Sequence, residues 1–315
     1  MLLVLTAIAV VSVGITATMG YRIVRRSIEQ QSFQYLIAVR EMKANQIEDY
    51  LRIIVDQAVT MAESRLIVEA MRDFREAFRS MKEDRLADER GEQDLRLYYQ
   101  TEFFPRLEST GDAEGNLDDY WPRDETARRL QKIYIHDNPF ETGSKHLLDD
   151  ALDGSTYSQA HRQYHPSIRN FLERFGYYDI FLIDHETGKV VYSVFKEVDF
   201  GTSLVDGPYW GTNLAEAFQS ARDAGRGKFK IVDFRPYAPS YGGQASFIAT
   251  PIYDADEVIG VLAFQMPVDR INDIMTSRQE WGRVGLGETG ETYIVGDDLT
   301  LRNQSRFLIE DRENY

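Results

Sequence analysis

Two short apolar runs separated by a polar turn form the clearest strand signal in the chain. Apolar side chains fall on both faces of the first run, with Tyr178, Ile180 and Leu182 on one face and Phe181 and Ile183 on the other. Such a strand is covered on two sides. The polar segment 184–189 contains Gly188, which can take a positive φ and reverse the chain. Residues 190–192 then supply a β-branched and aromatic second strand.

The residues after this hairpin continue the same pattern. Residues 214–224 have helical spacing of apolar positions, and three further strands are predicted at 228–237, 245–253 and 258–266. Five strands with a helix between the second and the third are the order of a PAS-like antiparallel sheet. The concave face of that sheet can hold a small ligand. The predicted fold class is therefore α+β.

The first residues form an uncharged apolar run. Leu2 to Met19 comprises about 18 residues without a charge, which is long enough to cross a bilayer. A cleaved signal peptide is the alternative, but no Lys or Arg precedes the run. Arg22, Arg25 and Arg26 follow it, whereas positive charges normally stay cytoplasmic. We therefore expect a retained transmembrane helix. Its orientation is set either by a short basic tail preceding Met1, which we favour, or by another part of the protein.

A helical pattern follows the arginines. Apolar residues recur at steps of three and four, at Ala44, Ile47, Leu51, Ile54, Ala58 and Met61. No proline occurs from Ser27 to Arg79, so one long helix is predicted through most of this segment. Its apolar seam packs either against a second copy of the chain or along its own domain. The two arrangements can coexist at different heights, and a homodimer through this helix is one expectation.

Composition excludes some classes of partner. The 315 residues are 43% hydrophobic, which is sufficient for a packed core. The net charge of −15 argues against a nucleic-acid surface, because phosphate binding needs clustered cations. The absence of cysteine excludes disulfides and thiolate metal sites.

Several segments resemble the double Cache sensors of bacterial transmembrane receptors. These segments are His165-Pro166, 176–184, 191–197, 247–252, 260–267 and 287–296, and the resemblance covers most of 138–307. Receptors of this kind include methyl-accepting chemotaxis proteins, sensor kinases and receptor cyclases. The resemblance implies a receptor held in the inner membrane, with its sensor region in the periplasm or outside the cell.

The resemblance also implies a domain order. It comprises a transmembrane helix at 1–20, a long helix at 21–80, a mainly helical and loop segment at 81–165, a membrane-distal Cache module at 166–275 and the start of a membrane-proximal module at 276–315. Cache sensors of amino acids carry an aspartate, which binds the ligand's ammonium group, at the place that Gln265 occupies here. This departure puts amino-acid recognition in doubt but leaves the fold unaffected.

Nine residues from strands and loops are predicted to line a ligand pocket. They are Tyr192, Lys196, Tyr209, Trp210, Asp233, Arg235, Tyr237, Phe247 and Gln265. Aromatic walls with a few charges suit a small polar or carboxylated ligand. Because strand side chains repeat every two residues, Asp233, Arg235 and Tyr237 should share one face. The alternative is that the aromatic residues are core and the charged residues lie at the rim.

Other chemistry has weaker support. The glycines at 285, 287 and 290 match a dinucleotide fingerprint, but residues 292–295 read as a strand where a helix is required. His161 and His165 could share a helical face, but no acidic partner has characteristic metal-ligand spacing. No catalytic constellation is recognisable, so we expect neither an enzyme nor a cofactor. The predicted function is small-molecule sensing, and the alternative is a protein-binding or scaffold module.

Overall fold

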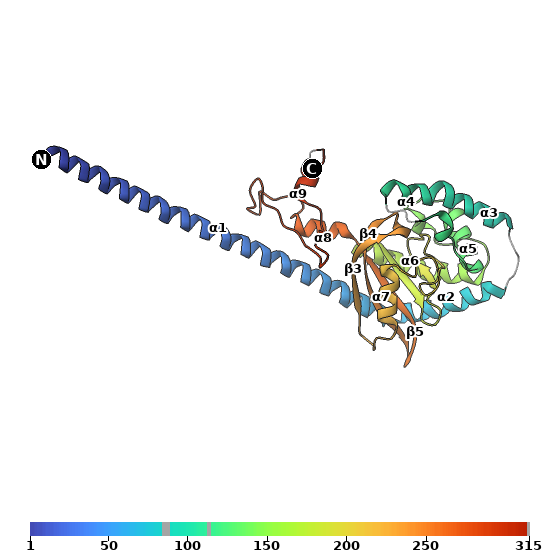
Figure 1. Cartoon of the computed structure of the whole chain (residues 1–315). Helices are drawn as coiled ribbons and strands as arrows, with labels where there is room; N and C mark the ends of the chain where they lie inside the picture. Colours follow the sequence, from blue (N-terminus) through green and yellow to red (C-terminus); the bar gives the residue numbers. More distant parts are fainter. Residues whose placement is uncertain (84–88, 112–114, 314–315) are drawn as a thin grey trace. The chain divides into compact units, whose positions relative to one another are not determined.

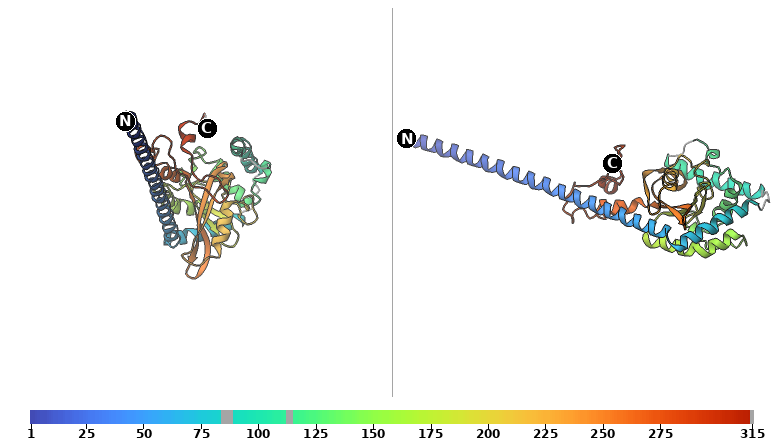
Figure 2. Two further views of the ribbon diagram at one scale, coloured as in Figure 1. Left: turned by 60° about the vertical axis from the view of Figure 1, so that its left-hand side comes forward. Right: turned by 90° about the horizontal axis from the view of Figure 1, so that it is seen from below.

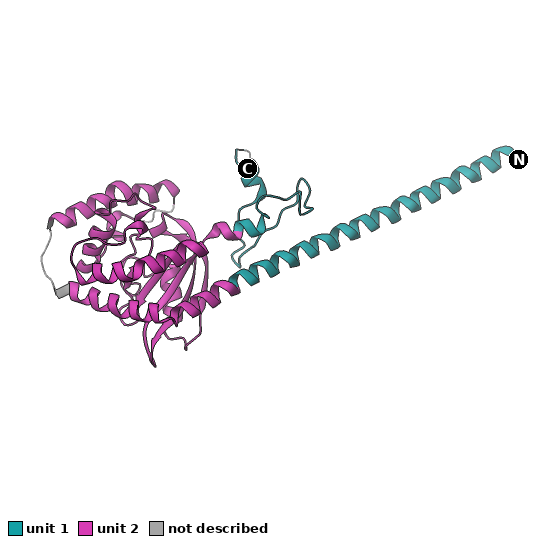
Figure 3. Cartoon of the chain, turned by 180° about the vertical axis from the view of Figure 1, so that it is seen from behind, with its two compact units in different colours: residues 1–51, 272–315 teal, residues 52–271 magenta. Residues whose placement is uncertain are grey.

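The chain divides into two compact units. The computed structural model describes residues 1–83, 89–111 and 115–313. One unit comprises residues 52–271, and the other comprises residues 1–51 and 272–315 (Figure 3). The first of these contains the sheet.

Five antiparallel strands form this sheet. They are β1 (Asp179–Asp184), β2 (Val190–Ser193), β3 (Lys230–Tyr237), β4 (Gly243–Asp254) and β5 (Glu257–Met266), in the order β2-β1-β5-β4-β3. Strands β3, β4 and β5 are labelled in Figure 1. All six residues of β1 are buried, as its two apolar faces predict. Gly188 turns the chain between β1 and β2 with a φ of 65°, and a Cβ there would lie 2.6 Å from Val205. The predicted α+β fold class with a five-stranded antiparallel sheet is confirmed.

Helices cover both faces of the sheet (Figure 2). On one face lies α7 (Asn213–Arg222), whose Leu214 and Phe218 share a buried cluster with Phe181 of β1. On the other face lie α2 (Arg65–Glu83) and α6 (Thr156–Phe175). There the ring of Phe74 stacks on that of Tyr192, with 4.7 Å between centroids. The strands are therefore buried on both sides.

Short helices complete this unit. They are α3 (Glu89–Tyr98), the π-helix η1 (Tyr99–Phe103), α4 (Phe104–Thr110), η2 (Leu117–Asp119), α5 (Glu125–Gln131), the π-helix η3 (Lys132–His136), η4 (Lys145–Leu147) and η5 (Ala238–Ser240). Their apolar residues Leu95, Tyr99 and Phe103 join the same buried cluster as Phe181. Tyr98 and Tyr99, where α3 meets η1, belong to this buried cluster together with residues of the sheet.

The helix that was predicted through 27–79 is interrupted. Helix α1 (Leu2–Ala62) ends before Ser64, and α2 begins at Arg65. The Ser64 hydroxyl donates to the Met61 carbonyl at 2.6 Å and accepts from the Ile67 amide at 3.4 Å, so it satisfies backbone groups at both helix ends. Proline is thus not needed to break the helix.

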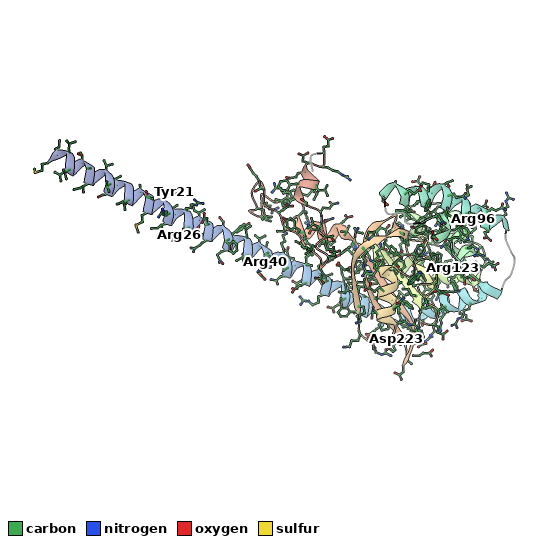
Figure 4. The ribbon with its side chains drawn as sticks, in the orientation of Figure 1. Tyr21, Arg26, Arg40, Arg96, Arg123 and Asp223 are labelled. Carbon is green, nitrogen blue, oxygen red and sulfur yellow. The ribbon has the colours of Figure 1, made fainter. Side chains whose placement is uncertain are left out.

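The apolar seam of α1 has two parts. Ile54 and Ala58 are buried, whereas Ala44 is exposed and Ile47 is half-buried. The labelled side chains of Tyr21, Arg26 and Arg40 lie along the preceding turns of α1 (Figure 4). The C-terminal part of the seam, at Ile54 and Ala58, is therefore buried within the unit that contains the sheet.

The second unit contains little regular structure after residue 275. It includes the end of α8 (Val268–Met275) and α9 (Arg306–Glu310). Val39 of α1 packs against Trp281 and Leu286, and the buried Lys43 ammonium donates to the Ser277 hydroxyl at 2.7 Å. The strand predicted at 292–295 is wrong in extent, because only a single bridge between Val295 and Leu301 forms. A strand needs a partner with several paired residues, which this segment does not have in the described chain.

Candidate functional site

The loop after β2 is fixed to the sheet by one aspartate. The carboxylate of Asp179 accepts hydrogen bonds from the Ser193 hydroxyl at 2.6 Å and from the amides of Val194 and Phe195 at 2.9 and 3.0 Å. Burial raises the pKa of Asp179 to about 6, although these hydrogen bonds act in the opposite direction. Asp179 therefore fixes the backbone at the start of the loop that carries Glu197 and Asp199.

A glutamine fixes the other side of this loop. The Gln131 amide donates to the carbonyls of Val198 and Phe200 at 2.7 and 2.8 Å, and its oxygen accepts from the Tyr99 hydroxyl at 2.8 Å. Gln131 is completely buried. Because both flanking carbonyls are held, Asp199 between them has a defined position on the α7 side of the sheet.

Glu197 is enclosed by hydroxyl groups. Its carboxylate accepts from the hydroxyl of Tyr178 at 2.7 Å and from that of Ser240 at 2.6 Å. The Ser240 oxygen in turn accepts from the Gln265 amide at 3.2 Å. Burial, followed by the charge of Asp199, raises the pKa of Glu197. The two carboxyl groups are thus close enough to influence one another.

Asp199 has one satisfied and one unsatisfied oxygen. Oδ2 accepts from the Tyr237 hydroxyl at 2.6 Å. Oδ1 is buried, and the backbone amides of Asp199 and Phe200 lie near this carboxyl group and act to lower its pKa. Neither amide, nor any other group among the residues that the structure describes, makes a hydrogen bond of good geometry to Oδ1. Burial raises the pKa of Asp199 to about 7. The same lack of a partner holds for Oε1 of Gln265 within the described chain.

Tyrosines surround the two carboxyl groups. Through-space charge from Glu197 or Asp199 contributes, after burial, to a raised pKa at Tyr98, Tyr99, Tyr178, Tyr209, Tyr237 and Tyr241. We call the set Tyr98, Tyr99, Tyr178, Glu197, Asp199, Tyr209, Tyr237, Ser240, Tyr241 and Gln265 the tyrosine–carboxyl cluster. Tyr178 and Tyr241 are only half-buried, so the cluster reaches the surface there.

Four of the nine predicted site residues lie at this cluster. Tyr209, Tyr237 and Gln265 belong to it, and Phe247 packs edge-on against Tyr237 with 5.0 Å between ring centroids. Phe247 and Asp179 both pair with Gln265 in the sheet, which places them in one row across three strands.

Three predicted residues lie outside the cluster. The Arg235 side chain is half exposed and pairs with Glu216 of α7 at 2.7 Å. Asp233 is exposed, and the strand register shifts between Val232 and Arg235. Asp233 and Arg235 are both exposed, whereas Tyr237 is buried, so the expected common face holds for the first two residues only, because the strand is irregular. Trp210 is 62% exposed.

Tyr192 and Lys196 contribute to a different buried network. Lys196 has a φ of 63°, and its ammonium group donates to the Ser193 carbonyl. This ammonium lies 4.5 Å from the ring centroid of Tyr192 and 5.3 Å from that of Phe200. Burial lowers the pKa of Lys196 to about 7. Lys196 is thus held among aromatic rings by cation–π contacts.

The two histidines of α6 extend this network. Their rings stack with 4.2 Å between centroids. His165 Nδ1 lies 2.7 Å from the Tyr192 hydroxyl, and His161 Nδ1 lies 2.9 Å from the Asp149 carbonyl. Burial lowers the pKa of both rings well below the usual value. No three His, Asp or Glu side chains in the described residues converge as metal ligands.

A separate cavity of about 200 Å³ lies beside the β1–β2 turn, and none of the nine predicted residues lines it. Its lining residues are Arg75, Phe78, Arg79, Asp184, Thr187, Lys189 and Val191. Arg75 pairs with Asp184 at 2.7 Å, and Lys189 pairs with Asp124. Since these cations already have acidic partners, the tyrosine–carboxyl cluster is the stronger candidate for a ligand site.

The sequence reasoning did not identify Glu197, Asp199, Tyr178 or Ser240 as site residues. Glu197 and Asp199 alternate with Val198 and Phe200, and such an interruption of an apolar run by acids was the available signal. Charged residues in a loop are normally solvated. Their burial depends on Asp179 and Gln131, which are distant in the sequence.

No protein-family model matches the sequence, and the comparison with curated proteins returns no match. Among solved structures, the chain is similar to the ligand-binding domain of the Pseudomonas fluorescens chemoreceptor CtaA in complex with L-serine, with 16% identity, 45% of this chain and 51% of that chain covered, and a TM-score of 0.31. The V. cholerae histidine kinase DctB sensor domain shows 18% identity, 57% coverage of each chain and a TM-score of 0.29. The matched region thus spans about half the length of each of these two chains.

A third similar structure is the ligand-binding domain of the Campylobacter jejuni chemoreceptor Tlp3 in complex with 4-methylisoleucine. It shows 8% identity, covers 80% of this chain and 76% of that chain, and has a TM-score of 0.31. The first and the third of these structures are ligand-binding domains of chemoreceptors, and the second is the sensor domain of a histidine kinase. Their identities and TM-scores are low, so the likeness assigns no role to any residue.

Proposed function

We propose that this chain is the extracytoplasmic ligand-sensing region of a bacterial transmembrane signalling receptor, and that it binds a small polar molecule at the tyrosine–carboxyl cluster. The observation that carries the proposal is the pair of buried acceptors without a partner among the described residues, Asp199 Oδ1 and Gln265 Oε1. Buried polar atoms are normally hydrogen-bonded. A bound molecule that donates hydrogen bonds would satisfy both.

The first helix supports a membrane anchor. A window of α1 has a mean hydropathy of 2.3, and none of its residues is buried. By length and composition, this helix can cross a membrane. We propose that it holds the receptor in the inner membrane, with the Cache module at 166–275 and the start of a second module at 276–315 on the periplasmic or outer side. The signal would pass through the membrane to an output domain.

The N-terminal part of the α1 seam, at Ala44 and Ile47, supports self-association. Ala44 is exposed and Ile47 is half-buried, so this part of the helix is accessible to a second copy. We propose a homodimer through this stretch.

Calorimetry on the full chain in lipid nanodiscs tests the binding site. The panel comprises small amines, amino acids, carboxylates and polyols. We expect at least one class to bind, and we expect Glu197→Gln and Tyr237→Phe to weaken that binding. Arg235→Lys is the matched control, because Arg235 is exposed and paired with Glu216.

Two results would count against this function. Binding that is insensitive to both cluster variants would remove the cluster from the site. Lack of binding by every class would favour the protein-binding or scaffold module instead.

A further inference from the structure

The cavity between α2 and the β1–β2 turn has a lining with more cations than acids. Arg75 and Arg79 reach it from positions one helical turn apart on α2, and Lys189 reaches it from the sheet side. Asp184, at the end of β1, is the acid in this lining. A cavity with such a balance of charges favours an anion over a cation.

The acidic partners of these cations are held with different firmness. Asp184 is buried, and its Oδ2 accepts from the amide of Thr187 at 2.9 Å and from its hydroxyl at 2.5 Å. Asp124 pairs with Lys189 and also caps α5 by accepting from amides of its first turn. The Glu186 side chain, in contrast, is 59% exposed. Glu186 is therefore the partner that a ligand can displace at least cost.

Glu186 also shows where an external carboxylate would bind. Its Oε1 lies 2.9 Å from Nη2 of Arg75, and its Oε2 accepts from Nη2 of Arg79 at 2.8 Å. The hydrogen bond and the charge of Arg75, assisted by Arg79, lower the pKa of the Glu186 carboxyl. The two guanidinium groups thus already stabilise one ionised carboxylate, with one oxygen on each arginine.

Asp184 orients the first of these arginines. Arg75 Nε lies 2.7 Å from Asp184 Oδ1, which leaves the Nη2 edge of the guanidinium to face Glu186. Neither Arg75 Nε nor Asp184 Oδ1 makes a hydrogen bond of good geometry within the described chain. The Arg75 Nε–H group is thus a buried donor whose hydrogen bond a ligand oxygen would complete.

The remaining wall of the cavity is apolar. Phe78 and Val191 line it, and both side chains are almost completely buried. A cavity of about 150 Å³ is large enough for benzene, so the volume of about 200 Å³ has room for a carboxylate with a short apolar body. Inorganic phosphate would leave this wall without a contact.

We propose that this cavity is a second binding site, which takes a small monocarboxylate with an apolar body, and that the ligand's carboxylate replaces Glu186 between Arg75 and Arg79. With Glu186 displaced, the three cations at the cavity face the two acids that remain, which leaves one positive charge for a monoanion. The site shares no residue with the tyrosine–carboxyl cluster, so it goes beyond the sensing function proposed above.

Matched ligands test the charge and the apolar body. Benzoate and butyrate are titrated by calorimetry into the full chain in phosphatidylcholine nanodiscs, beside benzamide, butyramide and inorganic phosphate. The amides keep the shape of the carboxylates but carry no charge. We expect both carboxylates to bind, and we expect the amides to bind at least about tenfold more weakly, as the loss of charge-assisted hydrogen bonds requires. Phosphate should also bind more weakly, because it lacks the apolar body.

Two arginines of α2 provide a matched pair of variants. The Arg79 side chain is 57% exposed and lines the cavity, whereas that of Arg72 is 53% exposed, pairs with Asp254 and does not line it. We expect Arg79→Gln to weaken benzoate binding about five- to tenfold, because it removes one half of the carboxylate clamp. Arg72→Gln removes the same charge from the same helix and should leave benzoate affinity unchanged.

Glu186→Gln should act in the opposite direction. This change removes the competing charge, so benzoate should bind about two- to fivefold more tightly, in line with the strength of an exposed ion pair. A purely structural role of Glu186 predicts no such gain. Tyr237→Phe alters the tyrosine–carboxyl cluster and should leave benzoate affinity unchanged. Circular dichroism of each variant establishes that it is folded.

The outcomes separate this site from the proposed sensing site. Equal binding of carboxylates and amides, phosphate binding as tight as that of benzoate, or no binding of either carboxylate would overturn the proposal. So would benzoate affinity that is unchanged in Arg79→Gln, equally reduced in Arg72→Gln, or not raised in Glu186→Gln. If Tyr237→Phe abolishes benzoate binding and Arg79→Gln does not affect it, the carboxylate binds at the tyrosine–carboxyl cluster. The sensing function then stands, and the second site is wrong.

Discussion

The Tyr237 hydroxyl, at the end of β3, donates a 2.6 Å hydrogen bond to Oδ2 of Asp199 in the loop after β2. Both side chains are completely buried. This bond joins the β3 edge of the sheet to the loop that Asp179 anchors at β1. The other oxygen, Oδ1, is the one that we propose as an acceptor for a ligand.

Tyr237→Phe should destabilise the protein. The change removes the hydroxyl that donates to Asp199 Oδ2 and leaves a buried carboxyl oxygen without this hydrogen bond. We expect the free energy of unfolding to fall by about 1–3 kcal/mol at neutral pH. Urea titration of the full chain measures it.

A double-mutant cycle distinguishes this bond from general packing loss. In an Asp199→Asn background, the effect of Tyr237→Phe should be smaller, because a neutral acceptor loses less than a charged one. Tyr293→Phe, at a half-exposed ring, is the control and should change stability little. Additive effects of the two cluster changes would show that the hydrogen bond is not responsible.

Asp199→Asn should change the pH dependence of stability. The Asp199 pKa rises from the ordinary 3.8 to about 7 in the folded chain, so the folded state holds a proton that the unfolded state has released. Stability contributed by this group is therefore present at low pH and is lost as pH rises from about 4 to about 7. The variant does not lose this stability. Relative to wild type, its free energy of unfolding should therefore rise by on the order of 2–4 kcal/mol across that interval.

The charged and titratable neighbours of Asp199 support this sign. They are Glu197, Asp179, Tyr237, Tyr209 and Tyr99. Each of them is a carboxyl or phenol group, which is either neutral or negative, so none supplies a positive charge that would reverse the effect. Urea midpoints of both proteins across this range give the difference. A constant difference between pH values would contradict the prediction.

The pattern of apolar and polar residues was sufficient to predict the strands of the sheet. Strand β1 and its turn were predictable because Ile180 and Phe181 mark two apolar faces and Gly188 marks the reversal. These signals are local, and the strand and the turn in the structure follow them. Helix α7 was predictable for the same reason.

The site was less predictable because its causes are not local. The irregularity near Val232 changes which residues of β3 face inward, and side-chain periodicity cannot reveal it. Lys196 was predicted to line the ligand pocket. Its positive φ and its hydrogen bond to the Ser193 carbonyl instead place the ammonium group among the rings of Tyr192 and Phe200. Glu197 and Asp199 were overlooked because Asp179 and Gln131 cause their burial from other elements.

Two charged substitutions in α1 should have different effects. Ile54 is 1% exposed within its own unit, so Ile54→Asp buries an unpaired charge and should cost about 3 kcal/mol or more of folding stability. Ile47 is half-buried, so Ile47→Asp should leave the urea midpoint nearly unchanged and weaken self-association.

Crosslinking measures the self-association. The chain has no cysteine, so Glu48→Cys introduces a single exposed thiol beside Ile47. We expect Ile47→Asp to lower the yield of disulfide-linked dimer in membranes, and we expect Asp49→Asn to serve as a neighbouring control without this loss. Equal yields with and without Ile47→Asp would remove this stretch from the proposed dimer contact.

Arginines in the apolar run should abolish membrane retention. Val10 and Val11 lie within the uncharged residues of α1 and are exposed in the isolated chain, as lipid-facing side chains would be. An arginine at the centre of a transmembrane helix costs about 2.5–3.5 kcal/mol on the insertion scale, so the pair should prevent stable insertion. Val10→Leu with Val11→Leu is the control, because it keeps the run apolar. The fraction of protein in carbonate-washed membranes is the measurement. If the arginine pair stays in the washed membranes as fully as the leucine pair does, this helix is not the anchor.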